Sequence, residues 1–440
     1  MGKDGFLIKN ATIVDSRGTT SGDVLIDDGR ITDVGKIEQS GGEYLIDAHG
    51  LILSPGIVDI QVHLREPGFE ESEEIETGAR ASAVGGMTAV QCMPNTNPCI
   101  DNVNTFRDVK HRSQNAMVDV FVSAAITKNR ASEENVDFKS LYEAGARTFT
   151  DDGDCVKTAR LMRETIETLS QFDDCVLAQH CEDHSLVHDG IIDEGEISKQ
   201  LGLKGRHRVG EEIIVARDIA LMRAFASPKL RYHVLHISTK EALTQVRDAI
   251  AQGLNVSSEV TPQHIALASD LLLSGNANFK MNPPLRTFDD INALRLGLKN
   301  GTIAAIATDH APHPKSKKDL GIEHAPPGML GVQTVLAASI THLVETGVLT
   351  IEELINVLCI NPAKIINAHK LENGGHGCDI TVGNKANIMI FDPQGEFVVN
   401  KKDLLSKSEN SPWEGHTLKG VVHYTFKSGE MTCEKGQPTK

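Results

Sequence analysis

Polar side chains follow most of the short apolar runs in the middle of the chain, at the point where each run ends. These side chains are Gln61, His63, Arg65, Asn95, Asp151, Asp152, His180, His236, Asp309 and His313. Polar residues that recur at the ends of successive apolar runs are hard to explain by packing. Imidazole and carboxylate groups together suit Zn²⁺ or a similar first-row ion, and an open coordination position would lower the pKa of a bound water to about 7. We therefore expect metal-assisted hydrolysis.

Taken one at a time, these residues have ordinary structural explanations. His180 alone is more often a hydrogen-bonded core histidine than a ligand, and Asp309 alone could cap the next helix. Arg65 could form a surface ion pair, and Asn95 could be a turn residue. The repetition of such residues at strand after strand is what indicates a site.

Eight apolar runs alternate with helix-like segments through the middle of the chain. They cover residues 56–64, 87–93, 118–126, 146–150, 175–180, 231–237, 254–260 and 302–309. Eight repeats of a strand followed by a helix predict an α/β fold, a closed (β/α)8 TIM-like barrel. Such barrels place their active sites at the C-terminal ends of the strands, which is where the polar residues fall. The segment 311–328, rich in Pro, Gly and Lys, is predicted to be a loop.

Both ends of the chain have the pattern of short strands. Residues 1–52 alternate apolar and polar side chains between Gly and Asp turns, and residues 378–400 and 415–431 repeat that texture. We expect a small β-sandwich domain formed by both chain ends, residues 1–53 and 375–440, beside a metal-dependent hydrolase barrel over residues 54–374.

Composition restricts the class of binding partner and the cellular compartment that we expect for this protein. The 44 Lys and Arg residues against 60 Asp and Glu leave a net charge of −16, which argues against nucleic acid, because phosphates need clustered basic residues. No run of 18 apolar residues occurs, so we expect no membrane span. The start lacks a signal-peptide pattern, and the eight cysteines include no Cys-x-x-Cys pair, which indicates reduced thiols and a cytoplasmic protein.

A set of motifs runs along the chain in a fixed order. They are PGIVDIQVHLREPG, GGMTAVQCMPNTNP, TFTDDG, QHCED, YHVLHIST, EVTPQH, NPPLR and IATDHAPH. Together they resemble the motifs of bacterial dihydroorotases of the long, barrel type within the amidohydrolase superfamily, and the REPG and TDHAPH pieces are the most specific. The resemblance covers essentially the whole chain. It implies the reversible hydrolysis of L-dihydroorotate to N-carbamoyl-L-aspartate, a step of de novo pyrimidine synthesis.

The resemblance also implies residue roles. The family's metal ligands fall on His63, Asp152, His180, His236 and Asp309. Of the two aspartates in TDDG, Asp152 is favoured over Asp151 because its spacing to His180 fits the family better. Asp309 is the implied catalytic base. The family's substrate contacts fall on Arg65, Asn95, Asn282 and His313, and on the backbone around Pro327 and Gly328, which matches a loop that closes on the ring.

One departure from the family pattern concerns the metal. The family usually has His-x-His after the first barrel strand, and here the sequence is Gln61-Val62-His63. An amide oxygen is a poorer zinc ligand than imidazole. We therefore expect one tightly bound Zn²⁺, held by Asp152, His180 and His236, and a doubtful second site.

Two alternatives to a dihydroorotase stay open. One is another cyclic-amide hydrolase, such as a hydantoinase or an allantoinase; against it, the end of the fourth strand carries no lysine that could be carboxylated to bridge two metals, since Lys157 comes later. The other is a catalytically silent subunit that scaffolds aspartate transcarbamoylase. Gln61 favours this alternative, and the retention of the other ligands argues against it. The expected partners are a small anionic substrate, a second copy in a homodimer and, as a further interpretation, aspartate transcarbamoylase.

Overall fold

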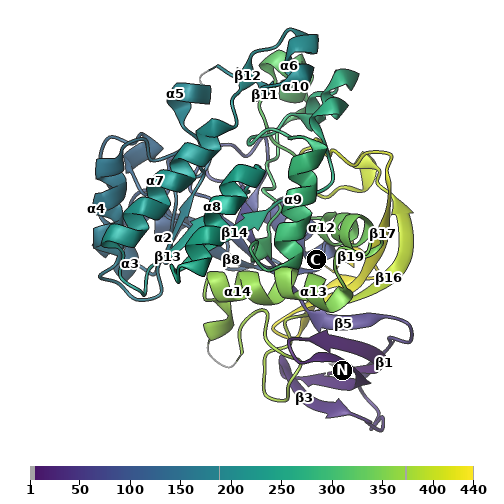
Figure 1. The fold of residues 1–440 in the computed structure, drawn as a ribbon. Helices are drawn as coiled ribbons and strands as arrows, with labels where there is room; N and C mark the ends of the chain where they lie inside the picture. The colour runs from purple at the N-terminus through teal and green to yellow at the C-terminus, as the bar shows by residue number, and fades with distance from the viewer. Residues whose placement is uncertain (1–4, 188, 372–373, 440) are drawn as a thin grey trace.

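The computed structural model describes residues 5–187, 189–371 and 374–439. Its largest part is a ring of parallel strands enclosed by helices, and the strands of the two chain ends, purple and yellow in Figure 1, lie at the same side of that ring. This is an α/β barrel with a β-sandwich built from the N- and C-terminal strands, as the sequence predicts.

The barrel has one strand within each predicted apolar run. The strands are β6 (Ile57–Val62), β7 (Met87–Cys92), β8 (Asp119–Val122), β9 (Thr148–Phe149), β10 (Val176–Gln179), β13 (Arg231–Val234), β14 (Val256–Val260) and β15 (Ala305–Ile306). All neighbours pair in parallel. Bridges between Val62 and His310 and between Ala124 and Phe149 close the ring. All six side chains of β6 are buried, as expected when helices cover the outside of a parallel sheet.

A helix follows each barrel strand. These helices are α1 (Ile75–Val84), α2 (Val103–Arg112), α3 (Phe138–Glu143), α4 (Ala159–Leu169), α7 (Val209–Phe225), α8 (Lys240–Ala251), α9 (Phe288–Lys299) and α12 (Val335–Ser339), which continues into η4 (Ile340–Val344). In α4 the Thr158 side chain accepts a hydrogen bond from the backbone of Leu161 and so caps the first turn. Leu161, Ile166 and Leu169 are buried on one face, which is the helical spacing that packs against a barrel.

Shorter elements occupy the loops and the segment after the barrel. They are η1 (Lys128–Arg130), α5 (His184–Val187), β11 (Ile192–Asp193), α6 (Glu196–Leu201), β12 (Gly205–Arg206), η2 (Ser269–Ser274), η3 (Ala277–Phe279), α10 (Lys315–Lys318), α11 (Gly321–His324), α13 (Ile351–Ile355), η5 (Asn356–Ile360), α14 (Asn361–Ile365), η6 (Ala368–Lys370) and η7 (Lys401–Asp403). Elements α5, β11, α6, β12 and α10 gather at the top of Figure 1. They belong to the loops that leave the C-terminal ends of β10 and β15.

The strands of both chain ends form one sheet. They are β1 (Phe6–Asp15), β2 (Gly18–Asp27), β3 (Arg30–Gly35), β4 (Tyr44–Asp47), β5 (Ile52–Pro55), β16 (Ile388–Val398), β17 (Thr417–Lys427), β18 (Glu430–Glu434) and β19 (Gln437–Pro438). β5 pairs with β1 on one edge and with β16 on the other, which joins the two ends of the chain. Ile8, Ile26, Ile388 and Phe426 share one apolar core. The predicted division at residues 53–54 and 374–375 stays a prediction.

The segment 311–328 is more ordered than its composition suggests. It contains α10 and α11, and Lys318 is buried. The Lys318 ammonium donates to the backbone carbonyls of Pro326 and Gly328, both at 3.1 Å, and of Lys280 at 3.4 Å. These carbonyls replace the water that a lysine normally keeps, so the ammonium holds the loop down. The sequence predicts a loop here, and the structure adds two short helices and a buried lysine that composition does not reveal.

The connection between β16 and β17 returns to the mouth of the barrel. The Asn410 amide donates to the carbonyls of Ala311 and Gly328, both at 3.0 Å. The Ser408 hydroxyl donates to the Ser72 carbonyl at 2.7 Å. The C-terminal strands therefore help to position the loops that surround the strand ends.

Candidate metal centre

Three buried side chains from neighbouring strands converge at the barrel mouth. Asp152 follows β9, His180 follows β10 and His236 follows β13, and all three can offer an atom to one metal ion. The His180 Nδ1 and His236 Nε2 atoms lie 2.8 Å apart, and Asp152 Oδ1 lies 3.8 Å from the first and 3.5 Å from the second. Tetrahedral zinc with bonds of about 2.0–2.1 Å keeps its ligand atoms about 3.3 Å apart. The triangle therefore fits a zinc ion.

A second group shares one residue with the first. His63 Nε2 lies 2.9 Å from Asp309 Oδ1 and 3.3 Å from Asp152 Oδ2. Asp152 thus turns one oxygen to each group. Its Oδ2 atom is buried and accepts no hydrogen bond. A buried carboxylate oxygen without a hydrogen bond is costly, and a cation would remove that cost.

The neighbouring aspartate has a different surrounding. Asp151 accepts hydrogen bonds from the backbone of Ile126 and Thr127 and from the Thr127 hydroxyl, at 2.5–3.0 Å. These contacts tie the loop after β8 to the end of β9. Asp152, and not Asp151, faces the histidines.

Three residues that follow barrel strands have a left-handed backbone. The φ angles are 64° for Arg65, 30° for His236 and 47° for Asp309. Residues other than glycine adopt such angles at a cost of about 1–3 kcal/mol each, and they persist where surrounding contacts fix them, often at active sites. All three side chains line the cavity at the barrel mouth.

Gln61 belongs to neither group of ligand atoms. Its amide nitrogen donates to Asp152 Oδ1 at 3.1 Å, and its Oε1 atom is buried without a hydrogen-bond partner. The residue that departs from the family pattern therefore orients the shared carboxylate. A second group with two imidazoles would need a histidine at this position.

Every residue of the predicted site lines one cavity of about 230 Å³ at the barrel mouth. Its walls are His63, Arg65, Asn95, Asp152, Gly153, His180, His236, Asn282, Asp309, Ala311, His313, Pro326, Pro327 and Gly328. These residues follow seven of the eight barrel strands, all except β8. No lysine lines the cavity within the described ranges, so nothing there could serve as a carboxylated bridge.

The cavity lining also includes a cation, Arg65, and two neutral polar side chains, Asn95 and His313. Burial lowers the pKa of Arg65 to about 10, which leaves the guanidinium charged at neutral pH, and its Nε donates to the Pro312 carbonyl at 3.3 Å. The Asn95 Oδ1 atom lies 2.9 Å from His63 Nδ1. Burial and the charge of Arg65 lower the pKa of His313 to about 3, so that its Nε2–H donates to the Pro327 carbonyl at 2.8 Å from a neutral ring.

Gly328 can only be glycine at this position. Its φ is 143°, and an added Cβ would lie 2.8 Å from both the Cβ and the carbonyl oxygen of Ala311. The absence of a side chain lets the loop backbone approach the cavity.

Asn282 lies beside the ion pair of Glu182 and Arg206. Its Nδ2 donates to Glu182 Oε2 at 3.1 Å, and its Oδ1 accepts from Arg206 at 2.8 Å. Burial raises the pKa of the Glu182 carboxyl, but its hydrogen bond to His180 and the charges of His180 and Arg206 outweigh burial, so that this pKa lies below its ordinary value. Arg206 was missed by sequence reasoning, because it lies in a short strand outside the barrel and no motif marks it.

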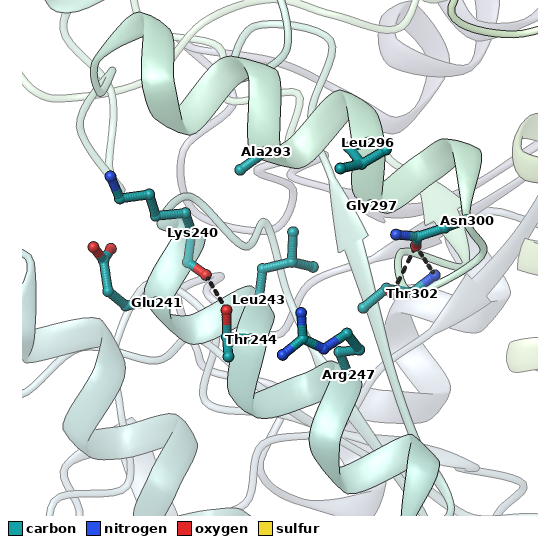
Figure 2. A pocket seen from close by; sticks show the side chains of 10 residues that line it. All are labelled: Lys240, Glu241, Leu243, Thr244, Arg247, Ala293, Leu296, Gly297, Asn300 and Thr302. Carbon is teal, nitrogen blue, oxygen red and sulfur yellow. Dashed lines mark hydrogen bonds between the residues drawn. The ribbon is translucent and has the colours of Figure 1, made fainter.

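A larger groove on the outside of the barrel has a different character. It measures about 340 Å³ and lies between α8 and α9, where Leu243, Leu296, Lys240 and Arg247 line it (Figure 2). The labelled residues include one carboxylate, Glu241, and no imidazole. It offers no set of metal ligands, so the chemistry belongs to the barrel mouth.

The chain is similar to known proteins along almost its full length. A family described as "Dihydro-orotase-like" matches residues 50–242. A protein named dihydroorotase from Thermoanaerobacter sp. (strain X514) is 42% identical over 436 residues, which cover 99% of this chain and 98% of that protein. The dihydroorotase of Bacillus subtilis (strain 168) is 40% identical over 437 residues, 99% of this chain and 100% of that protein.

Solved structures share the fold. The L-hydantoinase (dihydropyrimidinase) of Arthrobacter aurescens superposes with a TM-score of 0.86 at 24% identity, over 99% of this chain and 97% of that one. At this identity the likeness concerns the fold alone. Within residues 5–187, 189–371 and 374–439, no helix is long and apolar enough to cross a bilayer.

Proposed function

The chain belongs to the dihydroorotase family, and we propose that it hydrolyses the ring amide of L-dihydroorotate in the cavity at the barrel mouth. The observation that carries this proposal is that every residue of the predicted site lines that one cavity, beside buried ligand atoms spaced for zinc. A bound zinc ion is a Lewis acid that activates water and polarises a carbonyl.

Asp152, His180 and His236 would hold the tightly bound zinc ion. Their three atoms lie 2.8–3.8 Å apart, and the three side chains are buried at the cavity wall. His63 and Asp309 complete a second group with the other oxygen of Asp152, and this group has one imidazole because Gln61 replaces a histidine. We infer about one tight zinc ion per chain.

Asp309 is the proton carrier in this proposal. Its carboxylate reaches the cavity within 2.9 Å of His63 Nε2. It takes a proton from the attacking water and returns it to the ring nitrogen that leaves when the amide bond breaks. The carboxylate ends the cycle in the form in which it began, and the same transfers in reverse serve ring closure.

Arg65, Asn95 and His313 hold the carboxylate of the substrate. With a net charge of −16, the protein needs a local cation to attract an anion, and Arg65 supplies it at the cavity wall. A guanidinium can pair with a carboxylate through two parallel hydrogen bonds. Asn282 and the backbone at Gly328 contact the ring, so that the ring amide is oriented before attack.

A turnover screen tests the proposal directly. Purified protein is assayed with dihydroorotate, hydantoin and allantoin, before and after chelation and after zinc is added back. We expect turnover of dihydroorotate that chelation removes and zinc restores, with little turnover of the other two. Comparable rates on hydantoin would favour the other class of cyclic-amide hydrolase, and no turnover of any substrate would favour a silent scaffold.

The assembly and the compartment are further proposals. The family resemblance supports a homodimer and an association with aspartate transcarbamoylase, and sedimentation of the chain alone and mixed with that enzyme tests both. All eight cysteines are unpaired, which supports a reducing, cytoplasmic location.

A further inference from the structure

Arg206 reaches the barrel mouth from outside the barrel. It ends β12, which pairs with β11 in the excursion between β10 and α7, near the top of Figure 1. Its side chain passes over Gly190, where an added Cβ would lie 2.4 Å from Arg206 Cγ. The Nε atom donates to the Gly190 carbonyl at 2.8 Å. The excursion is thus shaped to aim this guanidinium.

One nitrogen of the guanidinium joins two groups of the site. Arg206 Nη1 donates to Glu182 Oε1 at 2.6 Å and to Asn282 Oδ1 at 2.8 Å. Asn282 Nδ2 donates in turn to Glu182 Oε2 at 3.1 Å. The three side chains form a closed ring of hydrogen bonds, so that moving one would break contacts of the other two.

Glu182, a member of this ring of hydrogen bonds, contacts the proposed zinc ligand His180. The contact is at the ring nitrogen that does not face the other ligand atoms. Glu182 Oε2 is 3.4 Å from His180 Nε2, while His180 Nδ1 faces His236 and Asp152. A carboxylate that accepts from one nitrogen of a histidine fixes the ring and leaves the other nitrogen free to bind metal. Removing such a partner typically costs about 10–100-fold in metal affinity or activity.

We propose that Arg206 is a positioning residue for the reaction: it fixes Glu182, and through it the metal-facing orientation of His180, and it fixes the Asn282 amide directly. The inference rests on the function proposed above. It makes a zinc ligand and a substrate contact depend on one guanidinium. Among the residues that the structure describes, Arg206 is the one lysine or arginine that hydrogen-bonds to Glu182 or to Asn282.

Zinc affinity of the metal-free protein is the decisive measurement, because it does not depend on turnover. For Arg206→Met we expect the zinc dissociation constant, measured by competition with a chromogenic chelator, to rise about 10–100-fold. Glu182→Gln should weaken zinc by a similar factor. If Arg206 acts through Glu182, the double variant should bind little worse than the weaker single variant.

Kinetics separate the second contact from the first. With zinc saturating, Arg206→Met should still raise KM for dihydroorotate, because the Asn282 amide loses its fixed orientation. Arg206→Lys keeps a cation beside Glu182 and should recover most of the lost zinc affinity. Lys204→Met is the matched control on the same excursion, since the Lys204 side chain is 59% exposed and pairs with Asp189, and it should change neither quantity.

Three results would overturn the inference: zinc affinity of Arg206→Met within about twofold of wild type, losses of Arg206→Met and Glu182→Gln that multiply, or no recovery in Arg206→Lys. If Arg206→Met does not fold, Glu182→Gln decides, and unchanged zinc affinity there also overturns it. Wild-type turnover of dihydroorotate is measured alongside. An inactive wild type would refute the proposed function, whereas an active wild type with an unaffected Arg206→Met refutes only this inference.

Discussion

The two groups of ligand atoms at the barrel mouth share Asp152 and differ in almost everything else. The first places two imidazoles and a carboxylate from three adjacent strands in one triangle, and its His180 lies against Glu182. The second has one imidazole and two carboxylates, and the Gln61 amide donates a hydrogen bond to the shared Asp152. We propose that the first group binds the zinc ion and that the second places Asp309 beside it. The difference suggests that zinc binding and proton transfer are divided between the two groups.

The largest expected effect comes from breaking the second group alone. Asp309→Asn keeps the volume of the side chain but removes the base, so we expect kcat to fall at least about 100-fold. The first group stays intact, so the variant should still bind about one zinc ion. Turnover and zinc content are measured together, with the exposed Asp270→Asn as control. Turnover within about tenfold of wild type would remove Asp309 from its role.

The substrate side of the cavity is tested by Arg65→Met. The substrate carboxylate would lose its charge partner, at a cost of about 2–5 kcal/mol. This corresponds to a rise in KM for dihydroorotate of about 30-fold or more, while a neutral dihydropyrimidine should be affected less. Arg107→Met, an exposed position on α2, is the matched control. Equal losses on charged and neutral substrates would show that Arg65 is structural.

A smaller effect is expected from a substitution in the loop at residues 311–328, whose C-terminal end lines the cavity. Lys318→Met leaves the carbonyls of Pro326 and Gly328 without their ammonium partner. We expect the free energy of unfolding to fall by about 1–3 kcal/mol and KM to rise, because the loop backbone beside the ring loosens. Lys317→Met is the control, since Lys317 is exposed and pairs with Glu71. Unchanged KM and unfolding in Lys318→Met would show that Asn410 alone holds the loop.

The smallest change in activity is expected for Gln61→His, which tests the difference between the two groups of ligand atoms most directly. Gln61→His should supply a second imidazole to the group of His63 and raise the zinc content from about one toward two ions per chain. Activity could move either way, since one ion suffices to activate water. Elemental analysis of wild type and variant decides, with the exposed Gln114→His as control. Two tightly bound zinc ions in the wild type would show that Gln61 does not weaken metal binding by the second group.

The sequence alone determined the barrel and the ends of its strands. Each apolar run contains one strand, and the predicted site residues all line one cavity. Both follow from local patterns: a parallel barrel strand buries both faces and reads as an apolar run, and its C-terminal end must leave the barrel at the mouth. The β-rich ends were also predictable, because alternating side chains and Gly turns are local signals.

Tertiary structure alone decided how those residues meet. Asp151 and Asp152 are adjacent in sequence, and only the path of the chain after β9 turns one to Thr127 and the other to the histidines. Arg206 finds partners 24 and 76 residues away, on two other loops of the mouth. No local pattern records such pairings, because they exist only once the ring has closed. Closure depends on parallel strands far apart in the chain, as Val62 and His310 show.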